Sequence, residues 1–356
     1  MTMISIVKKL SIILLAFTIF GCSTKIKDFE LYHKTMIPKS DHVSSEDIRK
    51  GNAKIVILDL DNNNIIEAEN ASIGKTSSAK IENVLAESKL IEIAERNNIE
   101  KLTEEISLSE INTDHIYSGP EVADYVLTGK IVSAGLEHKF QSSSSYYDSS
   151  SGTYVRIPAK NKYEASVTGN FKIIQLPSLK VIEVIEFSGA EYRSEDAIEN
   201  RSLFSSKIDP SNIKSEDNEL LRKAAIDAIE DHSHTIKNIF ANFKRGYILE
   251  KRNNGKKNIF LVSLGKVDNI KPGSKLDLYT IEEYIDPFDE TSSLEEMKIG
   301  EVVVTDKILE DKAWVIIKDK KAEARIQIGD FVKMNFKKSF AKTLDSFSDK
   351  TKAFMH

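Results

Sequence analysis

Apolar and polar residues follow two different periods along the first two thirds of the chain. The run 54–60 is short, apolar and β-branched and ends in polar turn residues, which predicts a buried strand. Apolar residues recur at helical spacing over 78–88 and over 218–243, and segment 163–173 alternates strictly between apolar and polar residues. This order predicts helices covering a mixed sheet, an α/β (α+β) fold, over 53–245.

The pattern changes after residue 245 to short strands separated by glycine and proline turns. The predicted strands are 247–251, 258–264, 275–279, 301–305, 313–317 and 331–334. Pro272-Gly273 is typical of a tight turn, because proline presets one backbone angle and glycine tolerates positive φ. We therefore expect a separate small all-β, SH3-like barrel over 246–336, followed by a basic tail over 337–356.

The first residues have the pattern of a secretory leader. Lys8 and Lys9 precede an uncharged apolar run, 10–20, that is too short to span a hydrocarbon core of about 30 Å. Residues 1–21 are therefore predicted to be a signal peptide. Residues 23–51 are polar, mixed in charge and without sustained periodicity, which predicts a tether. Together with Cys22, considered next, they give a predicted lipidated N-terminus and tether over 22–52.

The single cysteine, Cys22, follows the apolar run and a small residue. The sequence Ile19-Phe20-Gly21-Cys22 resembles the lipobox of bacterial lipoproteins, which implies cleavage before Cys22 and its acylation with palmitate-type chains. The alternative is an incidental cysteine beside an ordinary cleavage site. Ser23, where an aspartate would resemble an inner-membrane retention signal, favours the outer membrane.

Composition and charge narrow the classes of function. One cysteine excludes a disulfide framework, a thiolate zinc site and an iron–sulfur cluster. The formal net charge is -5, and the basic residues are scattered among acidic ones. We therefore expect no nucleic-acid partner.

Two motifs resemble ligand sites without completing them. Gly74-Lys75-Thr76 has the end of a phosphate-binding loop, but Glu69 stands where the first glycine is required. His232 and His234 are two positions apart, so on a helix they point about 200° from each other and cannot share a metal ion. The Gly74-Lys75-Thr76 motif is interpreted as a turn into a helix, and His232 as a core or partner-facing residue.

No residue set supports catalysis. Asp59 and Asp61 end a strand without a convincing acid–base partner, and Asp59 is interpreted as a turn former. The chain has no Gly-x-Ser-x-Gly elbow. Tyr146, Tyr147 and Tyr154 in the serine-rich stretch between strands are interpreted as part of a loop, with a contact surface or a pore constriction as alternatives. The sequence predicts no enzyme, no cofactor, no metal and no small-molecule substrate.

The α/β region resembles the curli secretion lipoprotein (CsgG) family over about 53–243. The matching pieces, in order, are Cys22, Ile55–Leu60, Ile73-Gly74-Lys75, Leu90–Arg96, Ala123–Ile131 and the final long helix. The resemblance implies an anticodon-binding-like or TolB-N-like fold. It also implies rings in which each subunit contributes two β-hairpins to a shared transmembrane barrel, here from 136–173 and 181–208.

The second of these hairpins fits a membrane poorly. A spanning strand needs about nine to eleven residues with a continuous apolar face, which 163–173 provides. Charged residues fall on both faces of 181–208: Glu183, Glu186, Glu191, Arg193, Glu195, Asp196, Glu199 and Arg201. A periplasmic, non-spanning domain is therefore favoured over a pore.

The C-terminal region resembles the C-terminal small β-barrel of the flagellar protein FlgT. The resemblance rests on Val262–Gly265, Val267–Leu276, Ile299–Val302 and Ile328–Val332. It implies a fold and no activity.

These patterns lead to one hypothesis and two alternatives. The chain is predicted to be a non-enzymatic outer-membrane lipoprotein on the periplasmic face, an oligomeric or docking component in export or assembly of a curli-like fibre or a flagellar basal ring. Its expected partners are membrane lipid, through acylated Cys22, and copies of itself or an envelope protein. A ring-forming secretion pore is the alternative, and a lipoprotein activator of a cell-wall synthase is the second.

Overall fold

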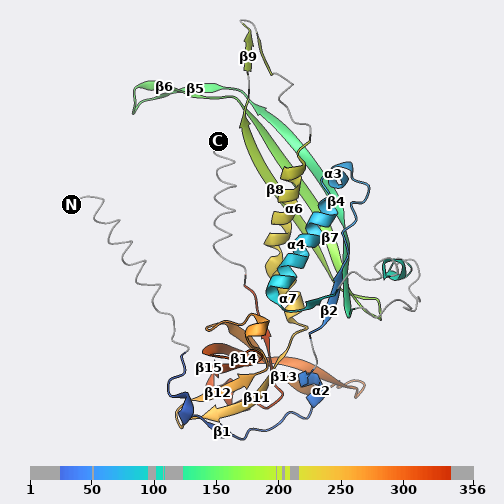
Figure 1. Ribbon diagram of the computed structural model, residues 1–356, viewed down its shortest axis with the longest axis vertical. Helices are drawn as coiled ribbons and strands as arrows, with labels where there is room; N and C mark the ends of the chain where they lie inside the picture. Colours follow the sequence, from blue (N-terminus) through green and yellow to red (C-terminus); the bar gives the residue numbers. More distant parts are fainter. Residues whose placement is uncertain are drawn as a thin grey trace, which may run out of the picture. The chain divides into compact units, whose positions relative to one another are not determined.

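The computed structural model describes residues 25–49, 52–94, 102–106, 108, 123–197, 199–202, 205–208 and 216–337. It divides into two compact units, each described separately below (Figure 1). The barrel unit joins residues 1–50 to 245–335, and the sheet unit comprises 51–244 and 336–356. Cys22, the signal peptide and nearly all of the basic tail lie outside the described residues. Among the described helices, none is long and apolar enough to cross a bilayer.

The sheet unit contains a five-stranded mixed sheet in the order β3-β2-β4-β7-β8. Its strands are β2 (Lys54–Ile57), β3 (Glu92–Ile93), β4 (Tyr125–Gln141), β7 (Lys160–Gln175) and β8 (Lys180–Asp196). The first two are parallel to their neighbours, whereas β4, β7 and β8 are long and antiparallel. Figure 1 shows these long strands curling over the helices. The predicted mixed α/β architecture is confirmed.

Helices α3 (Ile66–Asn70), α4 (Ile73–Ser88), α6 (Asn218–Asp231) and α7 (Ser233–Ala241) accompany the sheet. They cover the face that carries Tyr163, Val167 and Phe171, all buried as the alternation predicted. Strand β2 is buried on both faces, because a second apolar cluster around Val56 and Leu102 lies opposite the helices. This explains its unbroken apolar run.

The long helix predicted over 218–243 is two helices that meet at His232. This residue ends α6 and precedes α7, and its ring Nδ1 lies 2.8 Å from the carbonyl oxygen of Ala228. A hydrogen bond from the ring to the preceding turn satisfies a polar group that the apolar stripe alone would leave unpaired.

Two hairpins extend from one end of the long strands. They are β5 (Ser144–Asp148) with β6 (Thr153–Ile157), and β9 (Glu199–Ser202) with β10 (Ser205–Ile208). Both leave the same end, since the last residues of β4 and β8 pair with the first of β7. The serine-rich stretch predicted as a loop is therefore a hairpin. Tyr147 packs on Tyr154 across it, with ring centroids 5.3 Å apart, and such cross-strand aromatic pairs stabilise a hairpin.

The barrel unit is a closed barrel of six strands in the order β11-β12-β15-β14-β13-β16, with β16 pairing back to β11. The strands are β11 (Gly246–Asn253), β12 (Asn258–Val262), β13 (Lys275–Ile285), β14 (Ser292–Ile308), β15 (Ala313–Ile317) and β16 (Phe331–Met334). Inward apolar residues such as Phe260, Leu278 and Val304 form its core. Helix α8 (Lys320–Arg325) precedes β16. The predicted small all-β barrel is confirmed.

The described part of the predicted tether, 25–49, is packed on this barrel. It forms η2 (Phe29–Leu31), β1 (His33–Thr35), which pairs with β11, and α2 (Ser45–Arg49). Ile26 and Tyr32 are buried against Trp314. The tether interpretation is corrected here: isolated apolar residues enter the barrel surface one at a time, so the segment shows no periodicity although it is structured. We call residues 25–49 the strap.

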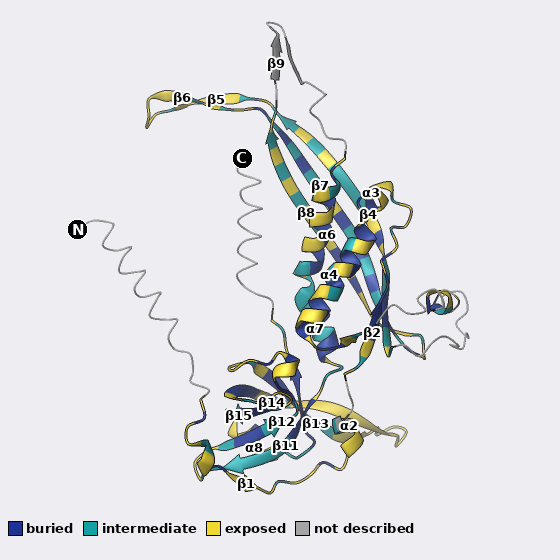
Figure 2. Cartoon of the chain, viewed as in Figure 1, coloured by how far each residue is buried: buried dark blue, intermediate teal, exposed yellow. Residues whose placement is uncertain are grey.

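Strands β13 and β14 continue well beyond the barrel as a two-stranded extension. The sequence predicted strands over 275–279 and 301–305, but β13 extends to Ile285 and β14 begins at Ser292. Figure 2 shows most of this extension as exposed. We call residues 281–297 the acidic arm. Its glutamates lie on both faces of the hairpin, so its sequence lacks the alternation of a half-buried strand.

Candidate interaction site on the barrel unit

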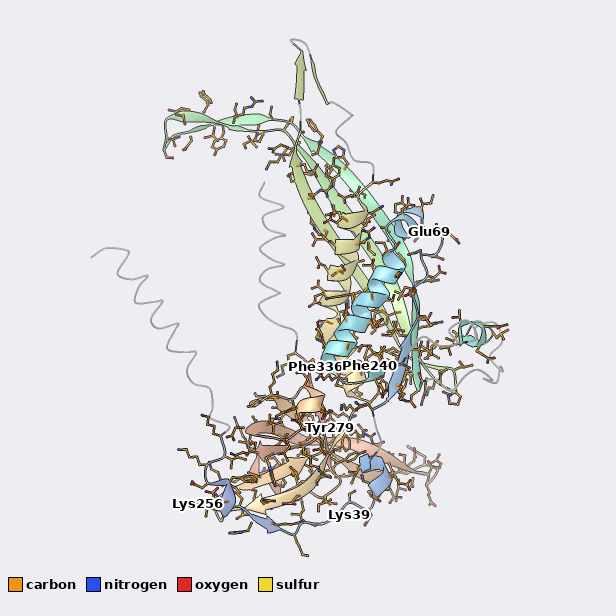
Figure 3. All side chains as sticks on the ribbon, viewed as in Figure 1. Lys39, Glu69, Phe240, Lys256, Tyr279 and Phe336 are labelled. Carbon is orange, nitrogen blue, oxygen red and sulfur yellow. The ribbon has the colours of Figure 1, made fainter. Side chains whose placement is uncertain are left out.

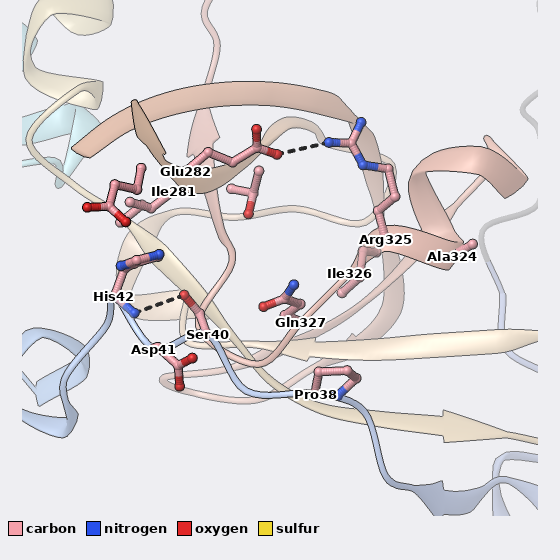
Figure 4. Close-up of a pocket in the computed structure, with 12 residues that line it drawn as sticks. Pro38, Ser40, Asp41, His42, Ile281, Glu282, Ala324, Arg325, Ile326 and Gln327 are labelled. Atoms are coloured by element: carbon pink, nitrogen blue, oxygen red, sulfur yellow. Dashed lines mark hydrogen bonds and ion pairs between the residues drawn. The ribbon is translucent and has the colours of Figure 1, made fainter. Parts of the chain in front are cut away.

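A pocket of about 540 Å³ lies between the strap, the root of the arm and the end of α8 (Figure 4). The strap contributes Pro38 and Ser40 to His42, β13 contributes Thr280 to Glu283, and Ala324 to Gln327 form the third side. The strap is fixed there by two backbone hydrogen bonds. Ser40 donates to the carbonyl oxygen of Ile328, and Ile328 donates to that of Pro38, each at 2.8 Å.

The pocket lining is mostly polar and includes both acidic and basic side chains. Arg325 donates to Glu282 at 3.0 Å, and this ion pair is exposed. Asp41, His42 and Glu283 add further ionisable groups at the rim. Among the described residues no cluster has the geometry of a metal site. The arrangement can form hydrogen bonds and ion pairs with a polar ligand or polypeptide.

A buried carboxylate supports one wall of this pocket. Asp330 is 1% exposed, and its Oδ2 accepts a hydrogen bond from the backbone of Gln327 at 2.8 Å. The Thr280 hydroxyl also donates to it. Burial raises the pKa of Asp330 above the ordinary carboxyl range, although these hydrogen bonds and Arg325 oppose the shift. Asp330 thus joins β13 to the turn before β16.

Replacing Asp330 with asparagine should remove a pH dependence of barrel stability. A raised folded-state pKa means that the folded chain binds the proton more tightly, so this residue's contribution to stability decreases as pH rises from the ordinary carboxyl range to the raised pKa. Asparagine retains an oxygen that can accept from Gln327 but does not titrate. Urea unfolding is followed by Trp314 fluorescence between about pH 4 and about pH 7. As the pH rises over this range, the free energy of unfolding of Asp330→Asn should increase relative to that of the wild type. A difference in the free energy of unfolding between variant and wild type that stays constant with pH would contradict the raised pKa of Asp330.

The root of the acidic arm is anchored by an aromatic and ionic cluster. Tyr279 stacks on buried Phe331, with ring centroids 5.6 Å apart. Arg245 and Lys333 both form ion pairs with Glu296. These contacts come from β13, β14, β16 and Arg245, the residue before β11, so they hold the base of the hairpin to the barrel.

Among the described residues, no ion pair or aromatic stack of this kind supports the distal half of the arm. Its large apolar side chains are exposed: Tyr284, Ile285, Phe288 and Leu294. Phe288, in the turn, is 95% exposed. An isolated two-stranded hairpin is marginally stable in water, and exposed apolar residues on it are typical of a contact surface. The arm is therefore the strongest candidate for binding a protein.

The phosphate-loop motif has a structural explanation. Gly74 lies in the first turn of α4, and its amide donates to Asn62 Oδ1 at 2.8 Å. A Cβ added at Gly74 would lie 1.9 Å from the carbonyl oxygen of Leu60. The glycine permits close approach of the helix to the strand end. The interpretation as a turn into a helix agrees with these contacts.

The remaining predicted candidates lie in the sheet unit and do not converge on a site. Asp59 accepts a hydrogen bond from the Ser78 hydroxyl at 3.0 Å, which ties the end of β2 to α4. His232 bonds to its own helix, and His234 lies 3.3 Å from the Thr235 hydroxyl. Tyr146 and Tyr154 are exposed on the first distal hairpin.

The pocket and the arm were missed by the sequence reasoning. Residues 281–297 contain seven acidic residues and no Lys, Arg or His. That local bias was a usable signal for the arm. The pocket had no sequence signal, because its three sides are far apart in the chain.

A family model matches the segment that carries most of this site. Residues 257–334 match the family described as flagellar assembly protein T, C-terminal domain. The match includes the arm, α8 and the pocket residues outside the strap. The match confirms the resemblance to the FlgT C-terminal domain that the sequence predicted for this part of the chain. No curated protein matches the chain.

Two solved structures have a distant likeness to the chain. One is a PelC dodecamer from Paraburkholderia phytofirmans, at 12% identity and a TM-score of 0.23, covering 56% of this chain and 92% of that chain. The other is the hypothetical protein CT253 from Chlamydia trachomatis, at 10% identity and a TM-score of 0.29, covering 53% and 99%. Likeness at this level carries no functional argument. The CsgG resemblance of 53–245 stays a prediction.

Proposed function

We propose that this protein is a non-enzymatic, lipid-anchored docking component in the assembly of an envelope structure. The observation that carries the proposal is the match of residues 257–334 to the C-terminal domain of a flagellar assembly protein. The matched segment contains the exposed arm, and the arm has the features of a protein contact surface. A flagellar basal ring is the context that this match favours over a curli-like fibre.

The anchor in this proposal is acylated Cys22. Multiple acyl chains hold a protein to a bilayer durably, at about 0.8 kcal/mol per buried methylene group. Mass spectrometry of the mature protein should find a lipid-modified Cys22 at the N-terminus, in the outer-membrane fraction. An unmodified thiol in a cytosolic fraction would contradict the anchor.

The docking role predicts a defined assembly. Electron microscopy of the full protein, extracted with detergent, should show oligomers of one size or a complex with an envelope protein. The variant that tests whether the arm makes this assembly is Phe288→Ser, because this exposed side chain has no role in the core. Removal of the C-terminal barrel strands would be a poorer test, because it would unfold the barrel unit. A monomer that copurifies with no envelope protein would overturn the proposal.

A secretion pore is the second candidate, favoured by the two hairpins that leave one end of the sheet. Both lie within 136–208, where the CsgG resemblance implies membrane-inserting hairpins. Their strands have five and four residues, against the nine to eleven or so that a spanning strand needs. Insertion would therefore require the ends of β4, β7 and β8 as well. Conductance in a planar bilayer would support this candidate, and its absence from detergent-stable rings would exclude it.

A further inference from the structure

We propose that copies of this chain associate head to tail, with the acidic arm of one copy docking on a basic end of the barrel unit of a second copy. The inference rests on the proposed function, since it names the contact that would build the oligomer. The structure supplies two exposed surfaces of opposite charge on one barrel unit, each with apolar side chains beside its charges.

The acidic arm provides the first surface. Of its seven acidic residues, Glu282 and Glu296 are engaged in ion pairs at the root. Asp286 and Asp289 accept hydrogen bonds from the turn backbone. Within the described part of the chain, the other three, Glu283, Glu290 and Glu295, form no ion pair. The arm therefore presents uncompensated negative charge around the exposed apolar residues of its tip.

The basic end provides the second surface. It consists of the β11–β12 turn and the neighbouring edge strand β1. Four of the seven residues in 251–257 are Lys or Arg, and none is acidic. Glu250 pairs with Lys34 and Arg252, which leaves the exposed Lys256 and Lys257 available for a partner.

Apolar groups and a free strand edge complete the basic end. Leu31 is 56% exposed and Met36 98% exposed, on either side of β1. Among the described strands, β1 is the last of its sheet, and none of them pairs with the edge that faces away from β11. Exposed strand edges with apolar neighbours are sites where another chain adds.

The two surfaces match each other in chemistry. Carboxylates and apolar side chains on the arm meet lysines and apolar side chains at the basic end, which gives both attraction and desolvated contact. Lys256 marks the basic end in Figure 3, and the exposed arm leaves the other side of the barrel in Figure 2. One copy therefore presents both surfaces to different neighbours. A contact of this heterologous kind closes a ring or extends a filament.

The test is charge reversal on each surface, read by sedimentation velocity of the full protein in detergent. Glu283→Lys with Glu295→Lys reverses the arm, and Lys256→Glu with Lys257→Glu reverses the basic end. Each pair should raise the dissociation constant of self-association about tenfold or more, and wild-type association should weaken as salt rises. Combining both reversals in one chain, or mixing the two reversed chains, should restore association.

The matched control is Glu310→Lys with Asp311→Lys, two acids on another exposed turn of the barrel. It should leave self-association unchanged, and Trp314 fluorescence should show that every variant keeps its barrel. Unchanged association after either reversal would overturn the proposal. So would a loss that the combined reversals fail to restore, or arm reversal that abolishes binding of a cationic envelope protein without affecting self-association. In each of these cases, an oligomer or complex seen by electron microscopy would still support the proposed docking function, and only the head-to-tail contact would be rejected.

Discussion

Phe331→Ala is expected to lower the free energy of unfolding of the barrel unit by about 3–5 kcal/mol. Phe331 is fully buried and stacks on Tyr279, and its ring centroid lies 6.1 Å from that of Tyr247. The Arg245 guanidinium also lies over its ring, 4.8 Å from the centroid. Alanine would leave a cavity between Val43 of the strap, Tyr279 at the root of the arm and Tyr247 of β11.

The measurement uses the only tryptophan of the chain. Trp314 lies in β15 of the barrel unit and is nearly buried, so its fluorescence in a urea titration follows this unit separately from the sheet unit. Phe288→Ala is the matched control, since the same change at a 95% exposed position should stay within about 0.5 kcal/mol. A loss below about 1 kcal/mol for Phe331→Ala would show that the site collapses around the smaller residue.

Gly74→Ala is expected to destabilise the sheet unit by about 2–3 kcal/mol, against the usual direction. In an exposed helix interior, alanine is favoured over glycine by about 1 kcal/mol. Here the added methyl group would meet the Leu60 carbonyl oxygen at 1.9 Å, and the carbonyl carbon at 2.9 Å. These are backbone atoms of the strand end, so α4 would have to move away from the sheet and lose its bond to Asn62.

Far-UV circular dichroism measures this effect, because the long helices α4 and α6 belong to the sheet unit. Lys75→Ala, one residue further along α4, is the control: Lys75 is exposed, so its loss should change stability by less than about 0.5 kcal/mol. If Gly74→Ala instead stabilised the unit, close packing of α4 on Leu60 would be wrong.

The acidic arm separates what local pattern can reveal from what it cannot. The acidic bias of 281–297 was visible in the sequence, but glutamates on both faces obscured the strand alternation. The hairpin forms because it continues strands that the barrel already pairs, from Leu276 opposite Val302 outward. Extending a pair of strands that is already hydrogen-bonded avoids the free-energy cost of forming an isolated hairpin. The arm residues by themselves therefore do not predict the hairpin.

The strap shows the same limit for burial. Ile26, Tyr32 and Val43 are apolar residues in a polar stretch without a period, so the sequence predicted a tether. Ile26 and Tyr32 are buried together against Trp314, and Val43 is buried at a second place, against Phe331. Sequence periodicity reveals an element that buries one continuous apolar face. It does not reveal single apolar residues that are buried one by one in a segment without regular structure.

By itself, the sequence determined the α/β architecture, the small C-terminal barrel and the buried face of β7, because each follows from a repeated spacing that one regular element turns into one apolar face. The tertiary structure alone decided that the strap belongs to the barrel, that α4 requires glycine at Gly74, and that strap, β13 and α8 enclose a pocket. These features depend on residues that meet only after the chain has folded, and spacing along the sequence carries no information about such distances.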